Sequence, residues 1–397
     1  MRGASMTQFD SDRARRLSWL AIAVYLAVLA IIAVLRTQAD FNTYYRAGGR
    51  VLSGLAIYPP TDSDRFLYAP IFAIGFAPLA ALPLKAAQLA FFLLNAFAFI
   101  ELIIGAGVML FGRDRQLSAA LIVIPVLLCF RFIGNNIEHG QINLLTLPLL
   151  VWAIVGAEES HRWRAGLMLA AAILIKPFAV LAAAYLFVRG RFGTLACAAV
   201  WGIALLLAPI VVFGAHGWHE QTLAYVQAVS SMTGRYRTML TNQSAVSAIA
   251  RLMEPVSTAD ASSPLPLALG MGVEIALAVV TLGWACRSGG KDRIALAALF
   301  CVIPGFAPIS WKSYFASLLV PYMLMTAAII DAREGRREAP PRAMTILLAI
   351  SVLLNLAPGS RLNHVALFFS AHLLSALVAM AALFVLWRHD ELVASSL

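Results

Sequence analysis

The chain has 397 residues, of which 61% are hydrophobic and only 13% charged, and its mean hydropathy is +0.82. This excludes an ordinary soluble enzyme, since soluble domains are about 25% charged. The net charge of +10 does not indicate nucleic-acid binding, because the basic residues cluster in short segments between apolar runs. No polar stretch approaches the ~100 residues of a separate soluble domain, so we expect a single integral-membrane domain over residues 1–397.

The apolar runs predict an all-α, polytopic membrane bundle of about twelve transmembrane or half-membrane helices. A helix needs ~20 apolar residues to cross the hydrocarbon core, and several runs are shorter than that. The expected helices cover residues 17–35, 67–84, 86–111, 117–134, 142–157, 165–188, 192–214, 265–285, 293–309, 315–331, 342–357 and 365–387.

Basic residues orient this bundle. Three arginines between positions 13 and 16 precede the first run, so the positive-inside rule makes residues 1–16 a cytoplasmic tail. The first run is long and lacks a small-residue cleavage site, which indicates an anchor rather than a signal peptide. The same rule makes 36–66 and 215–264 external loops. We therefore expect a multi-pass protein of the cell inner (plasma) membrane whose site faces the periplasm or the outside.

One part of the topology has two solutions. If all twelve helices cross, the turn at Gly140-Gln141 lies on the cytoplasmic side. If 67–84 only dips in and 165–188 is a hairpin of two half-helices, that turn lies outside. We favour the second arrangement, because Pro177 readily breaks a helix and Lys176 at mid-bilayer would cost ~3 kcal/mol.

Asp40 follows the first apolar run and opens a segment with helical periodicity. A carboxylate there lies where hydrocarbon meets water, within reach of a lipid-borne and a water-borne reactant. The aromatic and aliphatic residues of 40–55 fall near one helical face, which is typical of an interfacial helix in the first external loop. Asp40 would be the N-cap of that helix, and its tyrosines would lie at headgroup depth.

Ionisable side chains within or beside apolar runs are costly unless they have a use. Glu101 and Glu274 each stand alone in an apolar run, which favours a protonated or hydrogen-bonded structural carboxyl. Lys176 and Lys312 suit two uses: lysines that reach the interface from the ends of spans, or compact positive charges that bind a phosphate. The polar segment from residue 216 to 266 is long enough to cover a site.

Several motifs are absent from the sequence. It has no Walker loop, His-Glu-x-x-His motif, paired cysteines or glycine-rich turn after a strand. We therefore expect no nucleotide donor and no cofactor; Asp40 with Asp62 or Asp64 are the carboxylates that would hold a divalent ion if one is used. The four cysteines lie in apolar runs and are expected to be buried packing residues.

An ordered set of short motifs resembles a known family. They are Asp-Phe-x-x-Tyr-Tyr-x-Ala at 40–47 with Gly54 and Tyr58, Tyr68-x-Pro with the 77–83 run, Gly140-Gln141-x-Asn143, Ala165-Gly166-Leu167 with Lys176-Pro177, Asn242-Gln243-Ser244, and Pro308-Ile309-Ser310-Trp311. In this order and spacing, over about residues 36 to 325, the chain resembles glycosyltransferase family 87, membrane enzymes of the GT-C class. Family members often carry histidines after the Ser-Trp pair; Lys312-Ser313-Tyr314 stands there instead, so no role of such a histidine transfers.

The resemblance implies an inverting, polyprenyl-phosphate-sugar-dependent hexosyltransferase. It would move a hexose, with mannose favoured, to a hydroxyl of a lipid or glycan acceptor. One carboxylate acting as base suffices for such a displacement, while the departing phosphate needs positive charge and hydrogen-bond donors. Asp40 matches the family's catalytic aspartate and is the expected base. The candidates for binding the phosphate are Lys312, Lys176, Arg235 and Gln141. The candidates for shaping the sugar pocket are Asn242, Gln243, Trp311 and Tyr68.

Two other classes of protein remain open from the residues alone. A transporter or flippase for a lipid or small solute would use acids at mid-membrane depth, and Glu101 with Glu274 would fill that role. A glycan polymerase is also polytopic with a large external loop. The position of Asp40 separates these classes: a shared outer cavity with Lys312 and Trp311 favours the transferase, and a central path joining Glu101 to Glu274 favours transport.

Overall fold

The computed structural model describes residues 2–62, 64–253, 264–287, 293–307, 309–356 and 360–396; within them, the side chains of residues 2–11, 232–235, 392 and 394–396 are not described. Every regular element in these ranges is a helix. The elements are α1 (Arg2–Leu35), α2 (Ala39–Leu52), α3 (Pro70–Ala80), α4 (Leu84–Phe111), α5 (Ala119–His139), α6 (Asn143–Glu158), α7 (Arg162–Ile175), the 3-10 helix η1 (Pro177–Ala179), α8 (Val180–Val188), α9 (Phe192–Leu207), α10 (Ile210–Arg235), α11 (Ala245–Met253), α12 (Leu265–Arg287), α13 (Arg293–Val302), the 3-10 helix η2 (Lys312–Leu318), α14 (Leu319–Arg333), α15 (Arg342–Leu353), α16 (Ser360–Phe368) and α17 (Ala371–Ser396).

The all-α polytopic bundle expected from the apolar runs is confirmed. Six helices among the described residues are long and apolar enough to cross a membrane, and a seventh span results if α9 and α10, which bend by 82°, are counted together. Five further apolar helices are shorter than a full crossing, α3 and α13 among them. The total of about twelve membrane segments stays a prediction.

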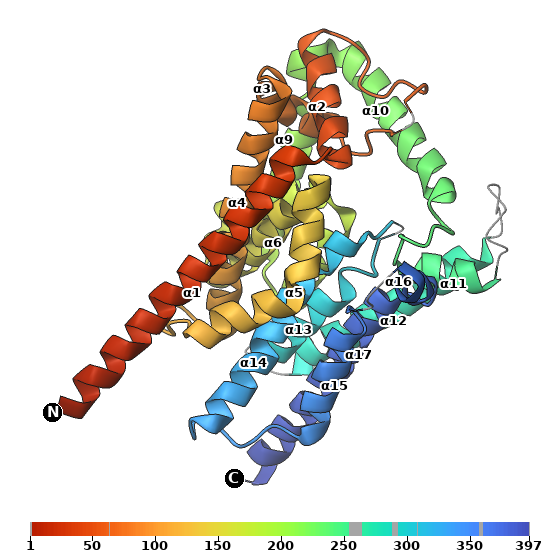
Figure 1. Cartoon of the computed structure of the whole chain (residues 1–397). Helices are drawn as coiled ribbons and strands as arrows, with labels where there is room; N and C mark the ends of the chain where they lie inside the picture. Colours follow the sequence, from red (N-terminus) through yellow and green to blue (C-terminus); the bar gives the residue numbers. More distant parts are fainter. Residues whose placement is uncertain are drawn as a thin grey trace.

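The basic segments gather at one end of the molecule, as the positive-inside rule requires. Ion pairs join the polar ends of the helices there, and both chain termini lie at this end (Figure 1). The pairs are Arg113–Glu159, Arg191–Glu158, Arg115–Asp331 and Arg337–Asp390. Arg15 of α1 joins the same layer through Gln116. Helices α2, α3 and α10 lie at the opposite end (Figure 1).

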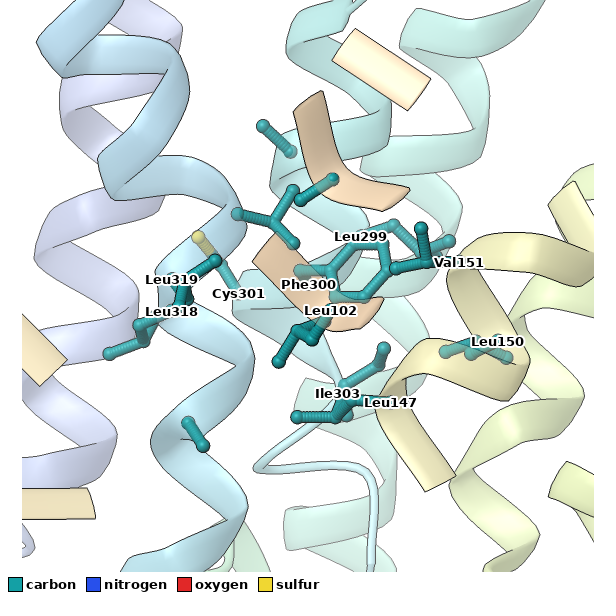
Figure 2. Packing of buried hydrophobic residues seen from close by; sticks show 14 of the residues in the cluster. Leu102, Leu147, Leu150, Val151, Leu299, Phe300, Cys301, Ile303, Leu318 and Leu319 are labelled. Atoms are coloured by element: carbon teal, nitrogen blue, oxygen red, sulfur yellow. The ribbon is translucent and has the colours of Figure 1, made fainter. Parts of the chain in front are cut away.

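The centre of the bundle is a continuous apolar core. Leu102 of α4, Val151 of α6, Phe300 of α13 and Leu319 of α14 are all fully buried and meet there (Figure 2). Because lipid tails are as apolar as these side chains, they stabilise the bundle through close packing between helices and not through removal from water. Three of the four cysteines are buried in the described structure, as expected, but Cys286 near the end of α12 is exposed, because the apolar run ends at Arg287.

Two expectations for the first external loop need correction. Gln38, not Asp40, is the N-cap of α2, and Asp40 lies in the first turn of the helix. Tyr44 does not face the lipid: it is 1% exposed and contacts Phe66, Phe76 and Phe91 edge-on. The apolar face of α2 packs against α3 instead of facing lipid, so an aromatic cluster fixes the position of Asp40.

The chain breaks at Lys176, as the proline after it predicts. Lys176 has extended backbone angles and ends α7, and η1 begins at Pro177. The Lys176 side chain is 8% exposed. The turn at Gly140-Gln141 lies beside Asp40, since Gln141 is hydrogen-bonded to it. This agrees with the favoured arrangement, in which Asp40 and this turn share one side of the membrane.

Candidate functional site

Asp40 lies at the boundary of two cavities. Its carboxylate oxygen Oδ2 accepts a hydrogen bond of 2.7 Å from Gln141 Nε2. Asp40 and Trp311 line both cavities, whereas Lys176 lines only the first and Lys312 only the second. A hydroxyl in either cavity can therefore approach the same carboxylate.

The Gln141 side chain is itself held in one orientation. Its Oε1 accepts hydrogen bonds from Asn143 Nδ2 at 2.9 Å and from Ser313 Oγ at 2.8 Å. With the oxygen occupied twice, the NH₂ group must face Asp40. The turn that places Gln141 needs glycine: Gly140 has φ +67°, and a Cβ there would lie 2.5 Å from Phe41 Cβ. Gln141 therefore orients the carboxylate, and it also lines the second cavity, so its expected role in binding phosphate stays a prediction.

Burial raises the pKa of Asp40 above its ordinary value of 3.8. The hydrogen bond from Gln141 and the positive charge of Lys176 oppose this rise, while the nearby carboxylate of Asp64 adds to it. Desolvation raises the basicity of a carboxylate, and a charge-assisted hydrogen bond keeps it ionised. The result is a carboxylate that is a stronger base than a solvated one, which suits proton removal from an alcohol.

The first cavity, which we call the aromatic cavity, has a volume of about 220 Å³. Lys176 Nζ donates a hydrogen bond of 2.5 Å to the hydroxyl of Tyr314 and lies 5.1 Å from the ring centroid of Tyr68. Tyr68 is itself hydrogen-bonded to Tyr44 at 2.9 Å. Cations over aromatic faces are stabilised by about 0.5–2 kcal/mol, so Lys176 is held in place beside Asp40 without a salt bridge among the described residues.

The second cavity, which we call the cationic cavity, has a volume of about 400 Å³, within the ~300–1,000 Å³ range of small-molecule sites. Lys312 and Arg131 line it, together with the polar side chains Asn135, His139, Thr241, Asn363 and His372. Neither Lys312 nor Arg131 forms a salt bridge with a carboxylate in the described part of the chain. Two cations that have no salt-bridge partner among the described residues, in a cavity that Asp40 also lines, favour an anionic ligand.

Asn242 and Gln243 lie behind the site rather than in these cavities. Asn242 Oδ1 accepts hydrogen bonds from the backbone N–H of Ser244 and of Ser310, at 3.2 and 2.9 Å. The N–H of Gln243 donates to the carbonyl of Ser310 at 2.7 Å. Both amides are fully buried. They therefore brace the segment that carries Trp311 and Lys312, a role that their place in the sequence did not indicate.

Helix α10 covers the aromatic cavity, as the length of the polar segment after residue 216 suggested. Tyr225, Val229 and Tyr236 line the cavity from this side, and Tyr236 contacts the ring of Trp311 edge-on. Arg235, a candidate for binding phosphate, is the last residue of α10, and its side chain lies outside the described residues.

The sequence reading missed several residues of the cationic cavity. Arg131 follows an apolar run, and His372 opens another more than 200 residues later. Both stand alone, so neither is part of a local motif. The one available signal was that each is an ionisable side chain within or beside an apolar run, the same criterion that picked out Lys312.

Glu101 and Glu274 have separate surroundings. Glu101 accepts a hydrogen bond of 3.0 Å from the indole of Trp152. Glu274 is 4% exposed and packs against Gly305. The described residues contain no group of three or more metal-ligating side chains, and Asp62 is bound at both oxygens by Arg50, at 2.7 and 2.9 Å.

Known proteins are similar to this chain over much of its length. The chain is 26% identical over 349 residues, 80% of this chain and 76% of the relative, to the polyprenol-phosphate-mannose-dependent alpha-(1-2)-phosphatidylinositol mannoside mannosyltransferase of Mycolicibacterium smegmatis. It is 25% identical over 367 residues to the protein of the same name from Mycobacterium tuberculosis, covering 85% of this chain and 81% of the relative. An alpha-(1->3)-arabinofuranosyltransferase of Corynebacterium glutamicum is 29% identical over 215 residues, 51% of this chain and 47% of the relative.

The model of one protein family matches most of the chain. It covers residues 66–307, more than half of the sequence. Lys176 and Gln141 lie inside the matched range, whereas Asp40 and Lys312 lie on either side of it. This membrane protein belongs to glycosyltransferase family 87.

Proposed function

We propose that this glycosyltransferase transfers a hexose, with mannose favoured, from a polyprenyl-phosphate sugar to a hydroxyl of a lipid or glycan acceptor. The observation that carries the proposal is the position of Asp40: an oriented, half-buried carboxylate at the junction of a cationic and an aromatic cavity. The names of the two mannosyltransferase relatives, which are polyprenol-phosphate-mannose-dependent, support this donor.

Asp40 is the proposed general base. It removes the proton from the acceptor hydroxyl while the hydroxyl oxygen forms a bond to the anomeric carbon of the sugar. The bond between that carbon and the phosphate oxygen breaks, and the electron pair leaves with the phosphate. A positioned base contributes about 10²–10⁴-fold to such a step. A single displacement inverts the anomeric carbon, so a β-linked donor gives an α-linked product.

No general acid is required, because the phosphate departs as an anion. What it requires is fixed positive charge, which is worth more in a partly dehydrated site than in water. Lys312 is the first choice, because it lines a cavity with Arg131 and has no carboxylate partner within salt-bridge distance among described residues. Lys176 acts on the base: its positive charge lowers the pKa of Asp40 and so favours the ionised carboxylate.

The two cavities divide the substrates. The donor phosphate fits the cationic cavity, and Trp311, which lines both cavities, lies where the sugar ring would pass from donor to acceptor. Tyr68 and Tyr314 offer aromatic surfaces on the acceptor side. The site lies at the end of the molecule opposite the paired basic layer (Figure 1). The positive-inside rule supports a site on the outer face of the membrane.

The experiment is a transfer assay with purified protein in detergent or liposomes. Polyprenyl-phosphate mannose, glucose and arabinose are each supplied with envelope lipids and glycans, and labelled products are isolated. We expect one polyprenyl-phosphate sugar to be consumed and the product to carry an α-linkage by NMR. Absence of transfer from every polyprenyl-phosphate sugar, with a protein that is folded and monodisperse, would overturn the proposal.

A further inference from the structure

The wall of the cationic cavity opposite Asp40 comes from the C-terminal helices, outside residues 66–307 that the family model matches. His372, the second residue of α17, is 3% exposed and lines the cavity. Its ring contacts Phe132 edge-on, at a centroid distance of 5.5 Å, and lies 5.7 Å from the ring of Phe315. Such packing fixes the plane of the imidazole.

Asn355, which follows α15, determines which ring nitrogen of His372 carries the proton. The Asn355 amide donates through Nδ2 to the carbonyl of Ser351 at 3.1 Å and to Ser375 Oγ at 2.7 Å. Its Oδ1 therefore faces His372 Nδ1, at 2.9 Å. An amide oxygen only accepts, so Nδ1 carries the hydrogen and Nε2 of the neutral ring presents a lone pair.

Nε2 of His372 is buried and has no hydrogen-bond partner among the described residues. A buried polar atom without a partner is costly, and native proteins seldom keep one unless a ligand or water satisfies it. The group that satisfies such an unpaired lone pair is a hydrogen-bond donor, such as a hydroxyl. A phosphate, which only accepts when ionised, does not suit this atom.

The same asparagine holds a cation of the cavity. The backbone carbonyl of Asn355 accepts a hydrogen bond from Arg131 Nη1. Asn355 thus holds both residues: its backbone carbonyl binds Arg131, and its side chain binds His372. Besides the Asp40 carboxylate, the cavity thus presents two positive charges, Arg131 and Lys312, and the neutral acceptor of His372. This set matches a ligand that has an anionic group and a hydroxyl in the same head group.

We propose, resting on the function proposed above, that the cationic cavity binds the head group of the sugar donor, with Arg131 and Lys312 on the phosphate and His372 Nε2 accepting a hydrogen bond from a hydroxyl of the transferred sugar. His372 is then a specificity-determining residue that recognises the sugar rather than the carrier. Asn355 is a positioning residue that fixes the tautomer of His372.

The test separates the sugar from the phosphate. Purified full-length protein is titrated with polyprenyl phosphate and with its mannosyl form, and both dissociation constants are measured. We expect the native protein to prefer the glycosylated lipid. His372→Phe, which keeps an aromatic ring, should abolish that preference, a loss of ~10-fold for one neutral hydrogen bond, and should leave the affinity for polyprenyl phosphate unchanged. Arg131→Gln should weaken the binding of both lipids by a similar factor of at least ~10.

Two further variants keep the test decisive if His372→Phe does not fold. Asn355→Asp retains an oxygen that accepts from Nδ1 and should retain the sugar preference. Asn355→Leu removes that oxygen and should lose the preference, while its backbone carbonyl still holds Arg131. Thermal unfolding of each variant in detergent shows whether a loss of binding reflects unfolding; a merely structural histidine would lower both affinities together.

The possible outcomes are distinct. If the native protein binds neither polyprenyl phosphate nor its glycosylated form, the proposed function fails. If the native protein binds and discriminates, but folded His372→Phe or Asn355→Leu keeps the full sugar preference, the function stands and the assignment of His372 is overturned. If Arg131→Gln binds both lipids with native affinity, the phosphate site lies elsewhere.

Discussion

The cations that line the two cavities differ in their partners from the arginines at the opposite end of the bundle. At the end that holds the chain termini, arginines are bound by carboxylates, with Arg115 and Asp331 joined by two hydrogen bonds of 2.6 and 2.8 Å. At the other end, Lys312, Arg131 and Lys176 line cavities and form no salt bridge with a carboxylate among the described residues. Paired charge sets topology and joins helices, whereas charge held without a partner is available to a ligand.

The acids show the same contrast. Arg50 binds both carboxylate oxygens of Asp62. These hydrogen bonds lower the pKa of Asp62 by more than its partial burial raises it. Asp40, only ~20 residues earlier in the chain, is hydrogen-bonded by a neutral amide and has a raised pKa. An arginine partner would have made Asp40 a weak base; Gln141 orients the carboxylate without removing its basicity.

The strongest test of this comparison is a substitution of Asp40, for which we expect the largest loss of activity. Asp40→Asn keeps the shape of the side chain but cannot accept the proton, so kcat should fall by ~10³-fold or more. Glu101→Gln is the matched control: it also changes a half-buried acid to an amide, but one that is hydrogen-bonded to Trp152 away from the site. The measurement is transfer by the purified variants. Full turnover by Asp40→Asn would remove the base assignment, and selective loss in Glu101→Gln would favour transport.

The unpaired lysine gives the next largest effect. Lys312→Met removes the charge and keeps the aliphatic stem, and the KM for the donor should rise by ~10–100-fold, in line with the loss of one charge-assisted contact to phosphate. Lys85→Met is the control at the same end: Lys85 is exposed and donates to the carbonyl of Val34, outside both cavities. Initial rates at varied donor and acceptor check this. An unchanged KM for the donor would mean that Lys312 does not bind the phosphate and only extends its charge to the membrane interface.

The pH dependence tests the partner of Asp40. The base is active when deprotonated, so activity rises with pH through the pKa of Asp40, which burial places above 3.8. The hydrogen bond from Gln141 lowers that pKa. Gln141→Leu should therefore raise it and move the acidic limb of the kcat profile to higher pH, with activity partly restored by raising the pH. A profile that keeps its midpoint but drops at every pH would show that Gln141 acts only on structure.

The sequence predicted the helical architecture and Asp40 because both depend on local patterns. Apolar runs of sufficient length require helices in a membrane, and the acid at the end of the first run stands out against them. The break at Lys176 followed from the proline after it. Exact helix bounds such as the end of α13 at Val302 were not predictable, since packing and not hydropathy decides where a helix ends.

The composition of the cavities was not predictable, because it depends on contacts between distant segments. Gln141 and Asn242 were both predicted as ligands from their motifs, but their hydrogen bonds to Asp40 and to the backbone of Ser310 were not predicted. An amide donates and accepts with equal ease, so its residue type does not reveal its partner. His372 and Arg131 carry no motif, and only the fold brings them to Lys312.

The brace behind the site should give a moderate effect on stability. Asn242→Ala leaves the N–H groups of Ser244 and Ser310 without their acceptor, at about 1–3 kcal/mol for each buried donor. The thermal unfolding temperature in detergent should fall, and kcat should fall with it, because the segment carrying Trp311 and Lys312 loosens. If Asn242 instead contacts the sugar, the donor KM will rise in a protein of native stability, which would contradict the brace.

The smallest effect is expected at the paired end, where the comparison can be sharpened. Arg115→Gln removes one partner of Asp331, which keeps Arg336 at 2.7 Å, so the loss should be near the ~1 kcal/mol upper range of partly exposed ion pairs. Unfolding in detergent should shift slightly, and activity per folded molecule should stay within twofold. Since Arg115 is a paired arginine far from both cavities, a donor KM that rises as much as in Lys312→Met would mean that paired and unpaired cations do not differ in function, and the distinction between the two ends would be lost.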